Sequence, residues 1–491
     1  MGSISSALSV ISGALDADQE ALNVVANNVA NANTTGYTEE KPDWQENAPI
    51  NVGGILIGDG VTETGATSQR DRVLEERLDQ QQQLASASST RLTALNNMQA
   101  LFTPASGSSG STAGDIGSDI TSFFDSFSSL ESDPTDNALR EQVLSSASTL
   151  AGDISSAANS LNGQSMAIDQ EASGVVSQVN SLTSAIGQLN LEIESISPDS
   201  DAGTLEDQRQ QDLSQLSQLI GINQVTTENN GLSVTTTSGQ LLVSEGQSTQ
   251  LTTGTVNGVT DFFVGGTDIT SQLASGGGQL GGYLTAREVD IPGALSSLDQ
   301  LAYSISTTVN ADNNAGTDAN GATGAAVAGS ATGAMTLDIF SPPPTYAANV
   351  AAGGTDVSGA AVAMGVVMTN PSLISAAGAG DSTGDDSNSV TMANLANGLI
   401  VNGQTPINYY SNFVSTLGST VSEVQTENTA QNASVTQLQT QNNALSSVNL
   451  NDEAAAMSTF ENSYQAASQV FTILNAVMTS ALNLGEETAV S

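Results

Sequence analysis

Residues 457–481, MSTFENSYQAASQVFTILNAVMTSA, carry an apolar side chain at alternating steps of three and four along their whole length. This heptad spacing predicts an α-helix that buries one stripe against another helix. Because chain ends normally fray, an apolar stripe this close to the C-terminus predicts a partner helix. The stripe consists of Met457, Phe460, Tyr464, Ala467, Phe471, Leu474, Met478 and Ala481.

The N-terminal end carries a matching stripe, interrupted only by Asp18. We therefore expect the two end helices to pair as a coiled coil with each other, with copies of the chain, or both. Outside an assembly they have little else to bury against, which favours intermolecular packing. The N-terminal stripe consists of Ile4, Leu8, Ile11, Leu15, Leu22, Val25 and Val29.

Charge narrows the range of partners. The 491 residues include 51 acidic and 8 basic side chains, a formal net charge of −43, and no cation follows Arg287. Nucleic-acid affinity comes from neutralising phosphates, so we expect no nucleic acid as a partner. An anionic membrane surface is disfavoured for the same reason. No apolar run reaches about 18 residues and no cation precedes Lys41, so we expect a soluble protein that leaves the cell without a cleaved signal peptide.

The chain contains no Cys and no His. This excludes Ser-His-Asp and Cys-His catalysis and metal sites built on thiolate or imidazole. A carboxylate pair acting on sugars is the catalytic arrangement left, but among 51 acids close pairs arise without function. We expect no enzyme, no cofactor and no metal. A faint calcium-loop pattern lacks the required Gly and Glu, so we expect a solvated loop at Asp312, Asn314, Asp318 and Asn320.

Helical patterns dominate up to Gly221, after a turn at 31–37 and short strands and loops at 39–68. We expect helix at 72–102, a Ser/Gly linker at 106–114, and a helix of roughly 35 residues, about 50 Å long, that stops at Pro198. The only tryptophan, Trp44, is interpreted as a plug of a local core rather than an interface anchor. The glycine pairs at 53–54, 281–282 and 353–354 are interpreted as turns or close packing.

The period changes between Ile222 and Tyr283, where β-prone residues alternate with hairpin-type turns. Helix is expected again at 284–309, and an irregular Gly/Ala-rich segment at about 310–383. A last heptad stripe with a polar middle runs from Val414 to Leu445. Since helices precede and follow the β-rich segment, we expect nested hairpins with both termini at one end.

The predicted fold is therefore mainly α, an elongated helical rod with a smaller β-rich inserted domain. We expect terminal coiled-coil helices at 1–38 and 449–491, a helical body at 39–220 and 280–448, and an outer β-rich domain at 221–279.

Several motifs resemble the axial proteins of the bacterial flagellum. Ala26-Asn27-Asn28-Val29-Ala30-Asn31, followed by Thr35-Gly36-Tyr37-Thr38, resembles the N-terminal motif of rod, hook and junction proteins, and the segments 448–455 and 464–467 resemble the C-terminal one. The interior segments 189–193, 205–209 and 278–302 are similar to those of the hook–filament junction proteins. Three features depart from the family pattern. Glu39-Glu40 stands where a basic residue is usual, Asn451 and Asp452 stand where two acids are more usual, and the scarcity of Lys and Arg is unusual for the family.

The resemblance implies a structural adaptor whose copies form a ring between hook and filament, exported through the flagellar secretion channel to the cell exterior. It also implies as partners the hook protein, a second junction protein on the flagellin side, and an export chaperone at the C-terminal helix. The expected assembly interface joins both stripes to the motif residues Asn27, Asn28, Gly36 and Tyr37. A hook or rod subunit and a secreted acidic coiled-coil surface protein stay open as alternatives.

Overall fold

The computed structural model describes residues 2–52, 55–103, 115–196, 202–256, 258–324, 337–343 and 356–487. These residues form two compact units, one made of 1–87, 174–281 and 430–491 and the other of 88–173 and 282–429. The expected linker at 106–114, the glycine pairs 53–54 and 353–354, and the stop at Pro198 lie outside the described residues. The three-part domain division expected from the sequence stays a prediction.

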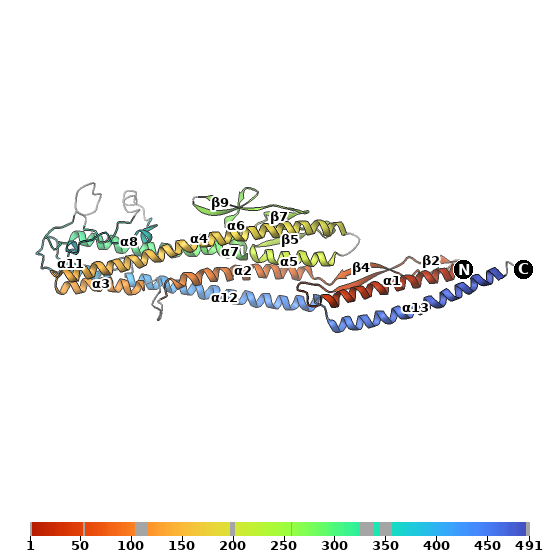
Figure 1. Cartoon of the computed structure of the whole chain (residues 1–491). Coiled ribbons are helices and arrows are strands. Elements are labelled where there is room, and N and C mark those ends of the chain that lie inside the picture. Colours follow the sequence, from red (N-terminus) through yellow and green to blue (C-terminus); the bar gives the residue numbers. More distant parts are fainter. Residues whose placement is uncertain are drawn as a thin grey trace. The chain divides into compact units, whose positions relative to one another are not determined.

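The first unit contains both ends of the chain. Helix α1 (Gly2–Asn31) lies antiparallel beside α13 (Leu450–Glu487), so the start of α1 and the last turns of α13 lie at the same end of this pair (Figure 1). The two predicted end helices and their side-by-side arrangement are confirmed, while knobs-into-holes packing between them stays a prediction.

A long β-hairpin runs along α1. Strand β1 (Glu40–Glu46) pairs antiparallel with β4 (Val61–Ser68), in the register Glu40 to Ser68, with a bulge between Asp43 and Trp44. The short strands β2 (Ile50–Val52) and β3 (Ile55–Ile57) continue the hairpin. Both β1 and β4 contact α1, so the hairpin forms a third layer on the terminal helix pair.

The rest of the first unit contains the first part of α2 (Arg72–Ala100), α5 (Gly203–Leu219), the last part of α4 (Asn137–Ile196) and two small antiparallel sheets. Side-chain hydrogen bonds join α2 to α5 and to β5, and α4 to β6. The predicted β-rich insertion is confirmed. One sheet has the order β5-β6-β7-β8 and the other β11-β10-β9. The strands are β5 (Ile222–Thr226), β6 (Leu232–Thr236), β7 (Leu241–Ser244), β8 (Gln247–Ser248), β9 (Leu251–Val256), β10 (Val259–Val264) and β11 (Thr267–Asp268), followed by α6 (Thr270–Gly276).

The second unit is a helical body around a phenylalanine cluster. Phe123 lies with its ring centroid 5.1 to 5.4 Å from those of Phe124, Phe127 and Phe340. Its helices are α3 (Ile116–Ser132), the last part of α7 (Gly278–Thr285), α8 (Ile291–Ala315), α10 (Ala360–Ala363), α11 (Ser387–Asn394) and the first part of α12 (Pro406–Ser446), together with the earlier part of α4 and the later part of α2.

Some elements differ from the sequence-based expectation. Helix α4 has 60 residues and begins at Asn137, so it is longer than the helix of roughly 35 residues expected from the sequence. Many positions between its apolar residues are Ala or Ser, which hide the apolar repeat although the helix continues through them. Helix α8 extends to Ala315, so the irregular segment starts later than expected. The expected solvated loop was wrong: Asn314 belongs to α8 and is buried, and the buried Asp318 carboxylate accepts the backbone N–H groups of Asn320 and Ala322 at 2.8 Å.

The heptad stripe predicted on α12 is confirmed. Leu417 and Val424 are buried, and the polar middle meets α2 through hydrogen bonds from Asn428 to Ser88 at 3.1 Å and between Gln81 and Gln431. Only its last member, Leu445, is exposed.

Candidate assembly site

The stripe predicted on α1 is turned slightly from the face that the structure buries. Val25 is buried and Ile4, Leu8, Ile11, Leu15 and Leu22 are half-buried, but Val29 is 40% exposed. The buried line is Ala17, Asp18, Ala21, Val24, Val25 and Asn28. A straight helix drifts by about 20° per heptad relative to a strict seven-residue repeat, which carries Val29 out of the contact and brings Asn28 in. Asp18, the break in the stripe, is itself buried, with one oxygen that contacts no donor among the described residues.

On α13 the predicted stripe faces α1 only in part. Tyr464 is exposed, whereas the other members are half-buried: Met457, Phe460, Ala467, Phe471, Leu474, Met478 and Ala481. A second apolar line lies one helical step to the side and is exposed: Val470, Ile473 and Val477, with Ile473 62% accessible. The apolar face of α13 is therefore wider than its contact with α1.

Asn28 joins four segments of the chain at the base of the helix pair. Its side-chain N–H group donates to the Glu40 backbone carbonyl at 2.8 Å and to the Glu453 carboxylate at 3.0 Å. Its side-chain oxygen accepts from the Tyr37 hydroxyl at 2.8 Å and from the Glu40 backbone N–H at 3.1 Å. A buried amide with all these partners fixes α1, the following turn, β1 and α13 in one register.

The turn after α1 explains the other motif residues. Asn27 accepts a hydrogen bond from the Asn31 side chain at 2.9 Å, so it serves the end of α1 and is itself exposed. Gly36 has φ of +81°, and a Cβ there would lie 2.4 Å from the Gln211 side chain, which donates to the Thr35 carbonyl at 2.8 Å. Only glycine fits this position without strain.

Burial and nearby acids raise the pKa of Tyr37 well above its ordinary value, so its hydroxyl stays a donor to Asn28. Burial likewise raises the pKa of Glu453, against the Asn28 hydrogen bond, which lowers it. We name Asn28 and its partners Tyr37, Glu40 and Glu453 the Asn28 node. In this node the amide of Asn28 has all its hydrogen-bond partners, and the carboxylate of Glu453 is partly shielded from water.

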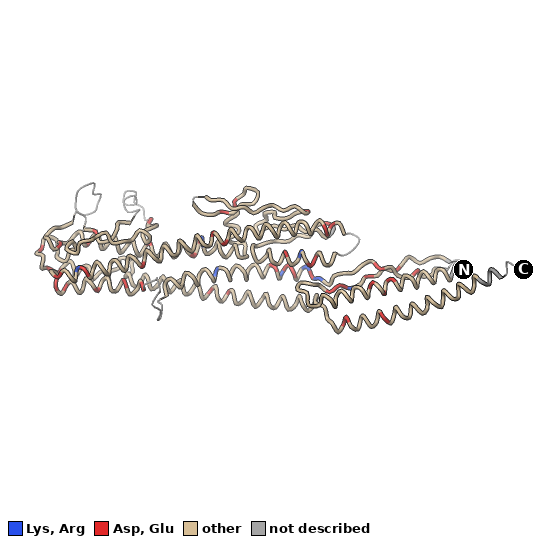
Figure 2. The backbone as a smooth tube through the Cα atoms, viewed as in Figure 1, with Lys and Arg blue, Asp and Glu red and all other residues tan. Residues whose placement is uncertain are grey.

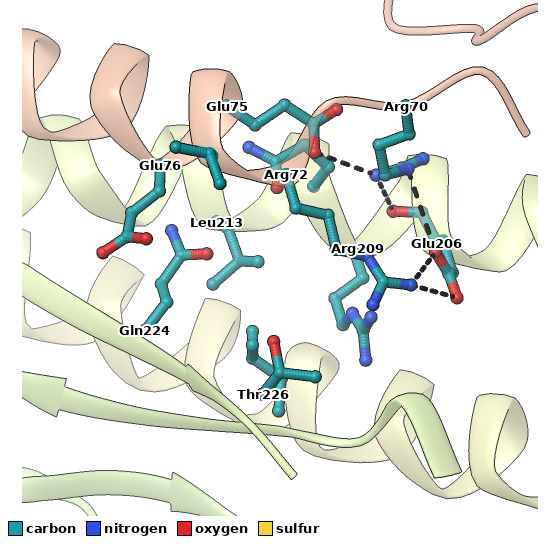
Figure 3. Close-up of a pocket in the computed structure, with 12 residues that line it drawn as sticks. Arg70, Arg72, Glu75, Glu76, Glu206, Arg209, Leu213, Gln224 and Thr226 are labelled. Atoms are coloured by element: carbon teal, nitrogen blue, oxygen red, sulfur yellow. Dashed lines mark hydrogen bonds and ion pairs between the residues drawn. The ribbon is translucent and has the colours of Figure 1, made fainter. Parts of the chain in front are cut away.

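Next to this node lies a cluster of arginines and carboxylates at the start of α2 (Figure 3). Arg70 contacts Asp207 and lies 3.4 Å from Glu75, and Arg72 contacts Glu206 at 3.0 Å. The second oxygen of Asp207 accepts the Thr38 backbone N–H at 3.0 Å. Through Asp207 the cluster connects the turn after α1 to α5 and α2.

Two carboxyl groups of this region are shifted strongly by burial. Burial raises the pKa of Glu75 to about 7, and the Arg70 charge offsets this only in part. Burial raises the pKa of Asp79 to about 6, although Gln224 and Gln210 donate to it at 2.8 and 3.0 Å. Both groups therefore hold a proton up to a higher pH in the folded chain than in the unfolded chain.

Most of this cluster was missed by the sequence-based expectations. No local spacing rule could pair its members, because Arg70 and Asp207 are 137 residues apart in the sequence. The scarcity of basic residues was the feature that could have predicted this cluster. In a chain with so many acidic side chains, each arginine is expected to pair with a carboxylate of the same chain.

Trp44 was misinterpreted as a plug of a local core. Its side chain is 40% exposed, and its ring meets Phe460 of α13 edge-on with the ring centroids 5.7 Å apart. The tryptophan therefore lies on the contact between the hairpin and the C-terminal helix.

Figure 2 shows how few basic residues lie among the acidic ones. Within the described part of the chain, no group of three or more His, Cys, Asp or Glu side chains is arranged to hold a metal ion. None of the described helices combines the length and apolarity needed to cross a lipid bilayer.

Comparison with known proteins agrees with this architecture. Residues 8–38 match the family described as flagella basal body rod protein, and residues 106–327 match the flagellar hook-associated protein FlgK helical domain. Both descriptions name components of the flagellar axis, and the first matched range contains Asn28 and the start of the turn that follows it.

Full-length relatives narrow the class. Flagellar hook-associated protein 1 of Salmonella typhimurium is 26% identical, over 96% of this chain and 98% of the relative. The proteins of Escherichia coli and Bacillus subtilis are each 25% identical, over 96% of this chain and 98% and 96% of theirs. Over nearly its whole length the chain is therefore similar to flagellar hook-associated protein 1 (FlgK).

The fold has a solved counterpart. The flagellar hook junction protein FlgK from Burkholderia pseudomallei superimposes with a TM-score of 0.61 at 20% identity, covering 74% of this chain and 99% of that one. The full-length matches to hook-associated protein 1 favour a junction protein over the hook or rod subunit and the surface protein left open by the sequence.

Proposed function

We propose that this chain is the structural adaptor that joins hook to filament, assembled as a ring of copies in the flagellar axis. In this proposal the α1–α13 pair forms the inner layer. The β-rich insertion lies outward, away from the axis. The adaptor has no catalytic activity, binds no metal or cofactor, and joins two polymers of different stiffness.

The observation that carries the proposal is the apolar surface left on α13. Val470, Ile473 and Val477 form a stripe that α1 does not cover. An exposed apolar stripe on an otherwise strongly acidic chain is a surface for packing against another helix. Copies of the same helix pair, or the terminal helices of the hook protein and of a second junction protein, offer such a surface in a common axis.

Export fits the same features. We propose that the chain passes the flagellar secretion channel unfolded and without a cleaved signal peptide, and that a chaperone in the cytoplasm covers α13 until then. The chain has no disulfide to reduce, and covering the stripe would suppress premature assembly. Mass spectrometry of the chain recovered from flagella should give the mass of the uncleaved sequence, and a shortened N-terminus would contradict this route.

The test is to remove the chain from its cell and restore it as variants. We expect deletion to leave hooks without filaments and filament protein in the medium, and the wild-type chain to restore attached filaments. Ile473→Asp should fail to restore them although the chain is exported, because a carboxylate in a dry helix contact costs several kcal/mol.

Gln469→Asp is the matched control, since it adds the same charge at an exposed polar position of α13. It should restore filaments. Attached filaments without the chain, or with Ile473→Asp at wild-type numbers, would remove the chain or its exposed stripe from the junction.

A further inference from the structure

Almost all basic side chains of this chain bind carboxylates or backbone carbonyls of the same chain. Arg91 pairs with Asp290 at 2.9 Å, Arg287 with Asp169 at 2.6 Å, and Lys41 with Glu39 at 3.5 Å. Arg70 and Arg72 belong to the cluster described above. The two remaining buried arginines donate to backbone carbonyls, Arg140 to Pro134 and Ile374, and Arg209 to Asn230.

Arg77 is the exception. It is exposed on α2 and has no hydrogen bond or ion pair with any described residue. Seven of the eight cations are therefore occupied within the described part of their own chain, and Arg77 is the one that stays available to a partner.

Two exposed apolar residues lie on the same face of α2 as Arg77, one on each side of it along the helix. The exposed line of α2 in the first unit consists of Val73, Arg77, Gln80 and Leu84, which we name the α2 stripe. Val73 is 61% and Leu84 48% exposed, at steps of four, three and four residues. At 1.5 Å per residue the stripe is about 16 Å long, two to three helical turns. The other faces of this part of α2 are turned inward, with Leu74, Glu75, Asp79, Gln83 and Ala85 buried.

We propose that the α2 stripe docks a second copy of this chain, with Val73 and Leu84 as apolar ends and Arg77 paired to a carboxylate of that copy. The inference rests on the proposed function, because copies meet in the ring. It adds a contact outside the terminal helices.

Charge complementarity selects the partner. A second copy carries 51 acidic side chains and a net charge of −43, so it presents carboxylates and almost no free cations. Packing such copies side by side is opposed by like-charge repulsion. An unpaired arginine at the contact offsets that repulsion locally, and its flanking apolar residues supply the buried area that an exposed ion pair alone lacks.

The absence of native cysteine allows a direct test. Gln80→Cys in the full chain, labelled with a thiol-reactive photocrosslinker, is restored to cells that lack the chain, and isolated flagella are irradiated. We expect a crosslinked dimer of the chain, with the attachment mapped by mass spectrometry to an acidic segment of the second copy. Gln437→Cys, an exposed glutamine of α12 in the same unit, is the matched control and should give little dimer.

Charge variants then test Arg77 itself. Arg77→Glu should lower the dimer yield of Gln80→Cys roughly tenfold, because it replaces an attraction by a repulsion. Arg77→Lys should retain most of the yield. Lys41→Glu makes the same change of charge on another exposed cation and should leave it unchanged.

The outcomes separate the two proposals. If both cysteine variants are absent from flagella that carry filaments, the proposed function fails and this inference fails with it. If they are incorporated but Gln80→Cys crosslinks to another flagellar protein, or to nothing, the proposed function stands and the docking of a second copy on the α2 stripe is refuted.

Discussion

Asn28→Asp changes one atom of the node at the base of the terminal helices. The side chain keeps its shape, and its first oxygen still accepts from Tyr37 and from the Glu40 backbone N–H. The amide nitrogen becomes a second oxygen, which then faces the Glu453 carboxylate at 3.0 Å and the Glu40 carbonyl at 2.8 Å. Two attractive contacts become repulsive without any change in packing.

The magnitude follows from the distance. Two like charges about 3 Å apart at an effective dielectric constant of about 20 repel by roughly 5 kcal/mol. Protonating a carboxyl group with an ordinary pKa of about 4.3 costs about 4 kcal/mol at about pH 7. This is less than the repulsion between two charged carboxylates, so one of them takes up a proton and the loss of stability is limited to that cost. We expect the docking of α13 on α1 to weaken by about 4 kcal/mol at about pH 7. The shared proton forms a hydrogen bond in acid, so the defect should shrink steadily as the pH falls from about 7 to about 5.

Trp44 provides the assay, because it is the only tryptophan and its ring meets Phe460 of α13 at 5.7 Å. Thermal unfolding followed by Trp44 emission should show a larger drop of the midpoint below wild type for Asn28→Asp at about pH 7 than at about pH 5. Asn27→Asp, the same substitution at the exposed neighbour, should differ little from wild type at either pH. Equal midpoints for the two variants in neutral buffer, or a defect that does not depend on pH, would refute the role assigned to Asn28.

Further predictions concern the apolar stripe of α13, buried positions of α4 and α1, and the dependence of stability on pH. Phe471→Asp should abolish attachment of filaments while shifting the thermal midpoint of the chain outside its terminal helices by a few degrees at most. Ile186→Asp, at a buried position in the part of α4 that belongs to the first unit, should instead unfold that unit, as circular dichroism would show. Asp18→Leu should raise the Trp44 midpoint, by about 1 to 3 kcal/mol of stability, because it removes a buried oxygen without a donor and completes the stripe; an unchanged or lower midpoint would contradict this. Glu75 and Asp79 have pKa values of about 7 and about 6 in the folded chain, above their unfolded values, so the folded chain binds more protons. Stability should therefore fall as the pH rises from about 4 to about 7, and Glu75→Gln with Asp79→Asn should flatten that dependence in urea titrations at several pH values.

The elements that the sequence predicted well are those specified by local periodicity. The helical ends, the stripe of α12 and the change to β structure at Ile222 follow from side-chain spacing within a few turns, which a linear pattern records. Composition excluded whole classes of chemistry because an absent Cys or His is absent in any fold. The motif around Asn28 and Gly36 indicated the axial class before any contact was known.

What only the tertiary structure decided depends on segments far apart in the chain. Asn28 and Glu453 are 425 positions apart, and no local pattern could pair them. The drift of a straight helix from a strict heptad repeat turns Val29 out and Asn28 in, but only the contacts with α13 and the hairpin decided which face of α1 is buried. The same holds for the cations: their number could be read from the sequence, but only the packing of α2 against α5 determined that Arg70 is occupied by carboxylates and Arg77, further along the same segment, is not. Spacing along a helix determines which residues share a face. Which segment packs against that face depends on the free energy of the whole fold, to which apolar burial and charge pairing contribute across distant parts of the chain.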